Sequence, residues 1–541
     1  MLQTVQNEIY LCLKRLGWES AQFSVERPRK NTFGHLSSNV ALTLAKQLKR
    51  RPLDIANDIA AELEEKIKGL EKIEIVAPGF INFTFTPEYF QAYIPRIRKE
   101  KEDFQKSNSG KRKKVQVEFV SANPTGPLTI GHGRQAVLGD TISRILEWHD
   151  FDVTREYYFN DAGRQMRMLG LSVLARYNEL MGMELDIPEG GYEGEYIIDI
   201  AADFRKKHGD LKTEDDLELF IEFASNAIFI TIRDTLKRLG IEHDVYFNEK
   251  DLYKQGKIEE VLTKLGEKGY TYQEDGAIWF KSTQFGAEKD RVLVKNTGEP
   301  TYRLPDIAYH REKIKRGFDL IIDIFGADHH ATYPDVKSAL EAMDLDTSHI
   351  RVLLHQFVTL TRDDEKVKMS TRKANFVTLD KLIDLVGTDV VRYFYIMRNM
   401  DSHLNFDLAL AQKQTDENPV FYLQYAHARI CNILLHSSEK GIKDYEDADL
   451  TLLKEPELIA LMDVMLEFKD IMDLCKRSLE PMHLANYLYR LATAFHKFYS
   501  VHRVVSENIE LSKARLQLID AVKIILANGL KILGVSAPER M

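Results

Sequence analysis

Hydrophobic positions in the first 110 residues recur first with helical spacing and then with strand spacing. Apolar side chains return every three or four positions over three stretches, residues 2–16, 40–48 and 55–67. Alternating apolar residues at 73–76 and 81–85 then flank Ala77-Pro78-Gly79, which indicates two strands joined by a turn. Residues 1–110 are therefore predicted to form an α+β domain, with the polar stretch 107–114 as its linker.

The pattern changes at Val115 to an alternation of strands and helices. An apolar strand at 115–120, a helix at 131–148 and a strand at 151–159 make a βαβ unit, which favours a parallel sheet of the nucleotide-binding type. A largely helical insertion is predicted at about 165–240. Four sheet-like runs follow it, at residues 277–280, 291–294, 319–325 and 350–360.

Beyond residue 388 nearly every hydrophobic pattern has helical spacing. The predicted helices cover residues 388–397, 419–436, 456–478, 482–505 and 513–532. The fold class is thus multidomain α/β plus all-α, with an N-terminal α+β domain, a parallel-sheet domain carrying a helical insertion, and a C-terminal α-helical bundle. The predicted domain boundaries are 1–110, 111–387 and 388–541.

Composition narrows the class of protein without naming a function. The 541 residues are enough for three to four domains, and no apolar stretch approaches the roughly 18 residues that a membrane span needs. The N-terminus reads as an amphipathic helix rather than a signal peptide, and three cysteines without a C-x-x-C pair argue against a disulfide framework or a zinc ribbon. We therefore expect a cytoplasmic protein with no membrane partner. The net charge is −9 although residues 461–541 carry +2, so a nucleic-acid site would be a local basic surface.

The first segment with candidate chemistry is the loop 121–134, between the predicted strand and helix. Its small residues allow close backbone approach, and the free N–H groups of the following helix favour an anion. His132, in the first turn of that helix, can donate to a phosphate oxygen. The chain contains no Walker loop. Taken alone, the loop is equally compatible with a Gly/Pro-rich connector that caps the helix.

The second segment is 367–373, which follows an acidic turn at 362–365. It places three cations, Lys368, Arg372 and Lys373, within six residues. A loop of this kind can close over a triphosphate and stabilise the charge that develops at the α-phosphate. Taken alone, a basic cluster of this kind is more often a solvated surface turn.

Together the two segments resemble the H-I-G-H and K-M-S-K-S signature motifs of class I aminoacyl-tRNA synthetases. Thr129 stands at the leading His of the first motif, and Thr371 stands at the second Lys of the other. The resemblance implies a Rossmann-type catalytic domain with the second motif in a loop at 362–376. It implies catalytic roles for His132, Thr129, Lys368, Ser370 and Arg372, and ATP contacts from Gly131, Gly133, His132, Lys368 and Met369.

Segments along the whole chain narrow the resemblance to the arginyl-tRNA synthetase family: 34–42, 118–128, 192–196, 290–294, 326–330 and 533–541. This resemblance implies an arginine–tRNA ligase. Such an enzyme activates L-arginine with ATP and Mg²⁺ to arginyl-adenylate, and then transfers the arginine to the 3′-terminal ribose of tRNA-Arg. It also implies that bound tRNA is needed before the first step proceeds.

The substrate side of the site follows from the chemistry of arginine and from the resemblance. A planar guanidinium calls for carboxylates that accept paired N–H bonds. The resemblance assigns arginine binding to Glu118, Ser121, Asn123, Tyr302, Asp306 and His329, and further ATP contacts to Asp328 and His329. Without it, Asp306 is equally compatible with a surface residue before a helix. Adjacent His residues do not point the same way, so we expect no metal site in the protein.

The RNA side is predicted to lie in the helical bundle. Residues 389–392 resemble the motif that names the anticodon-binding domain of the family, and helix 482–505 interleaves aromatic and basic side chains that suit stacking on bases. The predicted tRNA contacts there are Tyr487, Arg490, Tyr499 and Arg503, although such a stripe also fits a helix core with a solvated face. In the N-terminal domain, the loop 33–38 is expected to touch tRNA.

We expect the protein to be a monomer that binds tRNA-Arg, L-arginine and ATP. Two alternatives remain open from the sequence. One is a related adenylate-forming enzyme or a synthetase for another amino acid. The other is a synthetase-derived RNA-binding or regulatory protein that has lost catalysis, which is supported only by the departures at Thr129 and Thr371.

Overall fold

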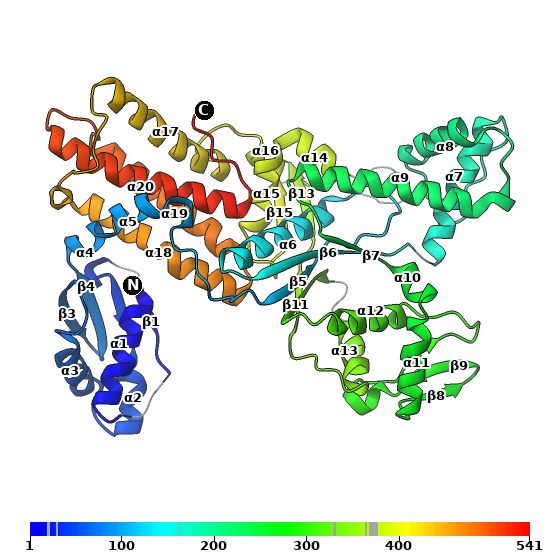
Figure 1. Cartoon of the computed structure of the whole chain (residues 1–541), viewed down its shortest axis with the longest axis horizontal. Helices are drawn as coiled ribbons and strands as arrows, with labels where there is room; N and C mark the ends of the chain where they lie inside the picture. The colour runs from blue at the N-terminus through cyan, green and yellow to red at the C-terminus, as the bar shows by residue number, and fades with distance from the viewer. Residues whose placement is uncertain (19–21, 29–30, 162, 328–331, 363–364, 367–376) are drawn as a thin grey trace. The chain divides into compact units, whose positions relative to one another are not determined.

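The computed structural model divides the chain into two compact units (Figure 1). It describes residues 1–18, 22–28, 31–161, 163–327, 332–362, 365–366 and 377–541. The first unit comprises Met1–Lys106, Thr415–Leu479 and His483–Met541, and the second comprises Ser107–Gln414 and Glu480–Met482. The domain boundaries at 110 and 387 stay a prediction.

The second unit is built on a five-stranded parallel sheet, as the βαβ pattern predicts. The spatial order of its strands is β12-β11-β5-β6-β7. Their bounds are β5 (Lys114–Glu118), β6 (Asp152–Phe159), β7 (Val245–Asn248), β11 (Leu320–Gly326) and β12 (Ile350–His355). The chain leaves β5 toward β6 and β7 on one side and returns to β11 and β12 on the other. The strand order therefore reverses between β5 and β11, the point at which open α/β sheets bind ligands.

Helices cover this sheet and extend from it. They are α6 (Ile130–Trp148), α7 (Arg164–Leu180), α8 (Glu195–His208), α9 (Leu217–Arg238), α10 (Glu249–Lys254), α11 (Lys257–Glu267), α12 (Arg303–Lys315), α13 (Tyr333–Ala342), α14 (Leu379–Val386), α15 (Thr388–Ile396) and α16 (Leu408–Ala411). Helices α7, α8 and α9 confirm the largely helical character predicted for 165–240. Strand β5 is buried on both faces, because Val115 and Val117 on one face and Gln116 and Glu118 on the other are all buried.

Two small sheets lie apart from the parallel sheet. The runs at 277–280 and 291–294 are strands, as predicted, but they form an antiparallel sheet with β8 (Thr271–Glu274), β9 (Ala277–Phe280) and β10 (Arg291–Val294). The run at 350–360 is divided after His355, and its second part belongs to a sheet of β13 (Val358–Arg362), β14 (Glu365–Lys366) and β15 (Leu404–Asp407). Strand β15 lies in a region predicted as helical, because four residues are too few to show a strand period.

The first unit combines a four-stranded antiparallel sheet with helices. The sheet, in the order β1-β2-β4-β3, contains β1 (Val25–Glu26), β2 (Leu36–Ser38), β3 (Leu70–Val76) and β4 (Phe80–Phe85). The helices are α1 (Leu2–Arg15), α2 (Val40–Leu48), α3 (Pro52–Leu63), α4 (Pro87–Gln91), α5 (Tyr93–Glu100), α17 (Pro419–Glu439), α18 (Pro456–Ser478), α19 (Met482–Val501) and α20 (Ile509–Leu533). The helical end of the chain is therefore confirmed. None of the helices in the described ranges has the length and apolar character that a membrane crossing requires.

The segment 389–392 has a structural contact that its motif did not reveal. It lies in α15, within the second unit, and the Arg392 side chain is fully buried. Its guanidinium donates to Asp140 at 2.6 Å and to the carbonyl of Leu239 at 2.8 Å. Arg392 therefore ties α15 to α6, the helix that follows β5, and is not exposed to a ligand.

Candidate active site

The loop after β5 brings three polar groups together through a strained backbone. Val120 and Ser121 have φ angles of 72° and 40°, a left-handed conformation that a β-branched residue such as Val120 adopts only at a cost. The Ser121 hydroxyl donates to Glu118 at 2.7 Å and accepts the backbone N–H of Tyr158 at 3.1 Å. The turn thereby fixes the Glu118 carboxylate at the end of the central strand.

The N-terminus of α6 orients His132. Thr129 is the N-cap residue of the helix, and its backbone N–H donates to His132 Nδ1 at 3.2 Å. Because Nδ1 accepts a hydrogen bond, a neutral imidazole carries its proton on Nε2 and can donate from that atom. Threonine suits this position because it is a preferred N-cap residue. The departure from the leading His is thus accommodated by a helix-capping role.

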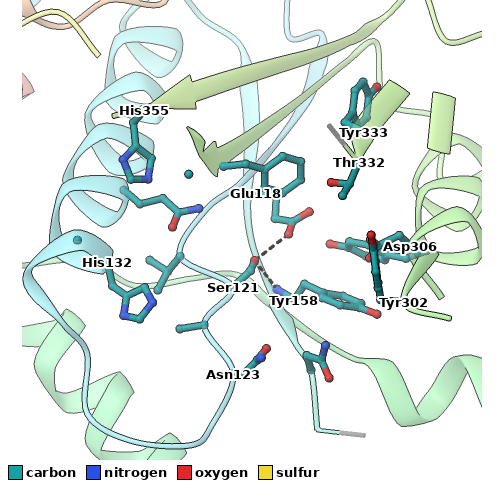
Figure 2. A pocket seen from close by; sticks show the side chains of 18 of the residues that line it. Glu118, Ser121, Asn123, His132, Tyr158, Tyr302, Asp306, Thr332, Tyr333 and His355 are labelled. Atoms are coloured by element: carbon teal, nitrogen blue, oxygen red, sulfur yellow. Dashed lines mark hydrogen bonds between the residues drawn. The ribbon is translucent and has the colours of Figure 1, made fainter. Parts of the chain in front are cut away.

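A cavity of about 680 Å³ opens where the strand order reverses. Its lining includes nearly all the described residues predicted to bind ligands: Glu118, Ser121, Asn123, Thr129, Gly131, His132, Tyr302 and Asp306. Figure 2 shows His132 and His355 on one side of the cavity, Tyr302 and Asp306 on the opposite side, and Glu118 and Ser121 between them. The site therefore has two ends, one at the helix N-terminus and one that carries acids.

The acidic end contains a residue that the sequence did not single out. Glu249, at the start of α10, is 7% exposed and accepts a hydrogen bond from the Tyr158 hydroxyl at 2.8 Å. Burial, together with the nearby charges of Asp306 and Asp161, raises the pKa of Glu249 to about 7, although the Tyr158 bond opposes this. An acid directly after a parallel strand is the signal that marks Glu249, but strand β7 itself was not predicted.

The other end is lined by groups suited to a nucleotide. His132, Gln135, His355 and Phe357 line it, and the Phe357 ring is 58% exposed. Gln135 donates to the carbonyl of Ile324, which holds α6 against β11. The positive end of the α6 dipole adds to the attraction for an anion.

Gly133 does not line the cavity, and the packing of neighbouring helices accounts for a glycine at this position. A Cβ atom at this position would lie 2.6 Å from Leu379 Cδ1 and 3.0 Å from the Tyr395 ring. The residue is therefore a glycine because α14 and α15 pack closely on α6. The ATP contact of Gly133 stays a prediction, and it concerns the backbone of this residue.

Several predicted site residues lie outside the described residues: Asp328, His329, Lys368, Met369, Ser370, Thr371, Arg372 and Lys373. Described residues that flank these segments in the sequence lie at the cavity or beside it. Gly326 lines the cavity, Thr378 forms a bridge with Thr129, and the N–H of Leu379 donates to the carbonyl of Leu128 at 2.8 Å. The segment that follows 367–376 is thus anchored beside the α6 N-cap.

Tyr487, in the helical part of the first unit, is a correction. Its ring is fully buried, and its hydroxyl donates to the carbonyl of Met465 at 3.3 Å, so it cannot stack on a base. Arg490 pairs with Glu467, and the Arg429 guanidinium lies 4.7 Å from the centre of the Tyr499 ring. Arg503 is exposed.

The exposed aromatic rings lie on the neighbouring face of α17 and α19. Tyr489 is 42% exposed, and its ring centre lies 5.1 Å from that of Tyr422. His496 lies 4.7 Å from Tyr422 and stacks on Tyr425 at 6.0 Å. We call this group, Tyr422, Tyr425, Arg429, Tyr489, His496 and Tyr499, the α17/α19 aromatic surface. The interleaving of basic and aromatic groups is thus present. Of the residues first proposed, Tyr499 belongs to this surface and Tyr487 does not.

In the N-terminal part of the first unit, the predicted contact loop 33–38 is only partly a loop. Leu36, Ser37 and Ser38 form strand β2 and are buried. Phe33 is 40% exposed, so the accessible part of this segment ends before the strand.

Three models of known protein families match successive parts of the chain. Residues 3–85 match the arginyl tRNA synthetase N terminal domain, residues 94–388 match the tRNA synthetases class I (R) catalytic domain, and residues 423–541 match the DALR anticodon binding domain. An arginine–tRNA ligase of Desulfotalea psychrophila is 52% identical over 96% of this chain and 95% of its own. One from Salinibacter ruber is 48% identical over 100% of both chains.

The fold has solved counterparts. Thermus thermophilus arginyl-tRNA synthetase superposes with a TM-score of 0.80 at 21% identity, covering 100% of both chains. A parallel sheet with its cavity at the reversal of strand order, and a class I catalytic domain over more than half of the chain, define a class I aminoacyl-tRNA synthetase. Within that class, the chain belongs to the arginyl-tRNA synthetase family.

Proposed function

We propose that the protein is an arginine–tRNA ligase that forms arginyl-adenylate from L-arginine and ATP and transfers the arginine to the 3′-terminal ribose of tRNA-Arg. The observation that carries this proposal is the division of the cavity into an acidic end and an anion-binding end. Asp306 and Glu249 line the first, and the α6 N-terminus with His132 lines the second. Arginine fits this polarity, because its cationic side chain suits the acidic end and its carboxylate can meet a phosphate at the other end.

At the acidic end, Asp306 and Glu249 accept the N–H groups of the guanidinium. Two carboxylates suit this ligand because it is planar, permanently charged and able to donate in pairs. Tyr302, 58% exposed, lies at the rim and covers the side chain. Glu118, Ser121 and Asn123 then receive the amino-acid end, whose carboxylate points toward His132.

At the other end, the α6 N–H groups, Gly131 and His132 Nε2 hold the triphosphate. The arginine carboxylate attacks the α-phosphate, and pyrophosphate leaves. A terminal ribose hydroxyl of tRNA next attacks the acyl carbon, and AMP leaves. Both steps depend on positioning and on stabilisation of charge rather than on a covalent nucleophile. Lys368, Ser370 and Arg372 are proposed to stabilise the charge at the α-phosphate, with Asp328, His329 and Met369 contacting the nucleotide.

Magnesium enters as the counter-ion of ATP. Among the described residues, no group of three or more His, Cys, Asp or Glu side chains is arranged to hold a metal ion. The phosphate oxygens and water would then supply most of the ligands of the ion, as is usual for Mg²⁺ in nucleotide enzymes. No step of the reaction is assigned to a metal site of the protein.

The α17/α19 aromatic surface is the proposed contact for splayed bases of tRNA. Its rings offer stacking surfaces, and Arg429 and the nearby Arg490 and Arg503 offer charge to phosphates. The proposal includes action in the cytoplasm as a monomer. Size-exclusion chromatography with light scattering tests the monomer.

The test of the function is aminoacylation of total tRNA with labelled arginine, run beside ATP–pyrophosphate exchange with and without tRNA. The expected result is charging with arginine alone among the amino acids, with exchange only when tRNA is present. Exchange with another amino acid would identify a different synthetase. A folded protein that binds tRNA but charges nothing would refute the ligase and indicate a regulatory RNA-binding protein.

A further inference from the structure

Three buried acids form a row across the parallel sheet beneath the cavity. Asp323 on β11 pairs in register with Glu118 on β5, and Glu118 pairs with Glu156 on β6. All three side chains are buried. Neighbouring strands are about 4.8 Å apart, so three carboxylates in one row repel one another unless cations lie among them.

Helix α12 supplies the partners of this acid row. His310 Nε2 lies 3.1 Å from Asp323, and the Tyr309 hydroxyl donates to Glu156 at 2.7 Å. Arg316, which caps α12, donates to Glu156 at 2.6 and 2.8 Å. These residues lie on the same face of α12 as Asp306, because they follow it at intervals of three or four residues.

Lys313 is the centre of the arrangement. Its side chain is fully buried, and its ammonium bonds both Glu118 and Asp323, the second at 2.6 Å. It also lies 4.3 Å from the centre of the Tyr309 ring. Burial alone would lower the pKa of Lys313, but Asp323, Glu118 and Glu156 outweigh it and raise that pKa, so the ammonium is charged.

Of these three acids, only Glu118 lines the cavity. One of its oxygens accepts from Ser121 and the other from Lys313, and a carboxylate has about four acceptor positions, so capacity remains for a ligand. The Lys313 ammonium places a positive charge directly against Glu118, a charge that Glu118 shares with Asp323. Glu249, in contrast, accepts its bond from the neutral Tyr158 hydroxyl.

This difference in charge matches the two ends of arginine. The amino-acid end carries one ammonium and one carboxylate and has no net charge, whereas the side chain carries a full positive charge. We propose that Lys313 is a positioning residue for the substrate, whose buried ammonium holds Glu118 as an oriented carboxylate that receives the α-ammonium of arginine. This inference rests on the proposed function and adds to it a residue that sets which end of the substrate meets which acid.

The test compares two ligands by calorimetric titration: arginine, and desamino-arginine, in which hydrogen replaces the α-ammonium. The wild-type protein should prefer arginine by about tenfold or more, the range for a hydrogen bond to a charged group. In Lys313→Met, we expect the affinity for arginine to fall by about tenfold and that for desamino-arginine by less than about threefold. The preference for the ammonium should therefore largely disappear.

Matched variants separate positioning from general structure. Lys313→Arg keeps a cation and should keep the preference. Lys315→Met removes an exposed cation of the same helix, one that pairs with Glu312, and should change neither affinity. If Lys313→Met does not fold, the double variant Lys313→Met/Asp323→Asn removes the acid left without its ammonium, and thermal unfolding confirms its fold.

The outcomes are distinguishable. A preference that disappears in Lys313→Met or the double variant, and remains in Lys313→Arg, supports the inference. Equal weakening of both ligands, or an unchanged preference, overturns it while the proposed function stands. A wild-type protein that binds neither ligand overturns the proposed function, and with it this inference.

Discussion

The raised pKa of Glu249 predicts that arginine binding depends on pH near neutrality. Burial, Asp306 and Asp161 raise that pKa to about 7, so below this pH the folded protein holds Glu249 as the neutral acid. A guanidinium binds the carboxylate, and its binding must therefore expel the proton. Affinity should rise with pH through 7 and level off above it.

The magnitude follows from the fraction of Glu249 that is ionised. With a pKa of about 7, the apparent dissociation constant is multiplied by about 11 at pH 6, about 2 at pH 7 and about 1.1 at pH 8. Affinity for arginine should thus improve about tenfold between pH 6 and pH 8. In Glu249→Gln the side chain keeps its shape and cannot ionise, so the affinity should be weak at both pH values and nearly constant.

Calorimetric titration with arginine at the two pH values measures this change in affinity. Repeating the titration in buffers of different ionisation enthalpy gives the number of protons released on binding. Glu480 provides the control. Burial raises its pKa to about 7 as well, but it does not line the cavity, so Glu480→Gln should keep the tenfold dependence. A Glu249→Gln protein that still improves tenfold from pH 6 to pH 8 would refute the reasoning.

The same shift has the opposite effect on stability. Because the pKa of Glu249 is higher in the folded than in the unfolded protein, the wild type loses stability as pH rises from about 4.5 to 7. Glu249→Gln should therefore be more stable than the wild type at pH 8, by an amount on the order of 3 kcal/mol, and about equal to it at pH 4. Urea denaturation at the two pH values measures the difference, and a less stable variant at pH 8 would contradict it.

Three further predictions concern the other sites. Asp306→Ala should raise the KM for arginine about tenfold to a hundredfold and leave the KM for ATP nearly unchanged in steady-state aminoacylation; an unchanged arginine KM would remove Asp306 from the site. Arg392→Met should destabilise the protein by about 1–3 kcal/mol in urea denaturation, because it removes the fully buried partner of Asp140 and leaves that carboxylate with Arg144 and Arg155, and a neutral effect would refute the contribution of that pairing. Tyr489→Ala should weaken tRNA binding about fivefold or more in a filter-binding assay, whereas Tyr487→Phe should not change it. Weaker binding in Tyr487→Phe alone would contradict a contact on the exposed face of α19.

Local sequence predicted most of the architecture. The change from helical to strand spacing at Val115 predicted the βαβ unit, and the helical patterns from 419 onward predicted α17 to α20. These features depend on near neighbours, since the period of apolar side chains follows from helix and strand geometry alone. The loop 121–134 was found for the same reason, because its small residues, helix start and His132 are contiguous.

Tertiary structure alone decided which side chains meet. Glu249 joins Asp306 only because β7 ends and α12 begins beside the same cavity, and the acid row exists only because β11, β5 and β6 are neighbours in a given register. The burial of Tyr487 and the close packing at Gly133 depend on elements that arrive from elsewhere in the chain. Periodicity determines which face of an element is apolar, but the strand order and the packing of helices determine what that face contacts.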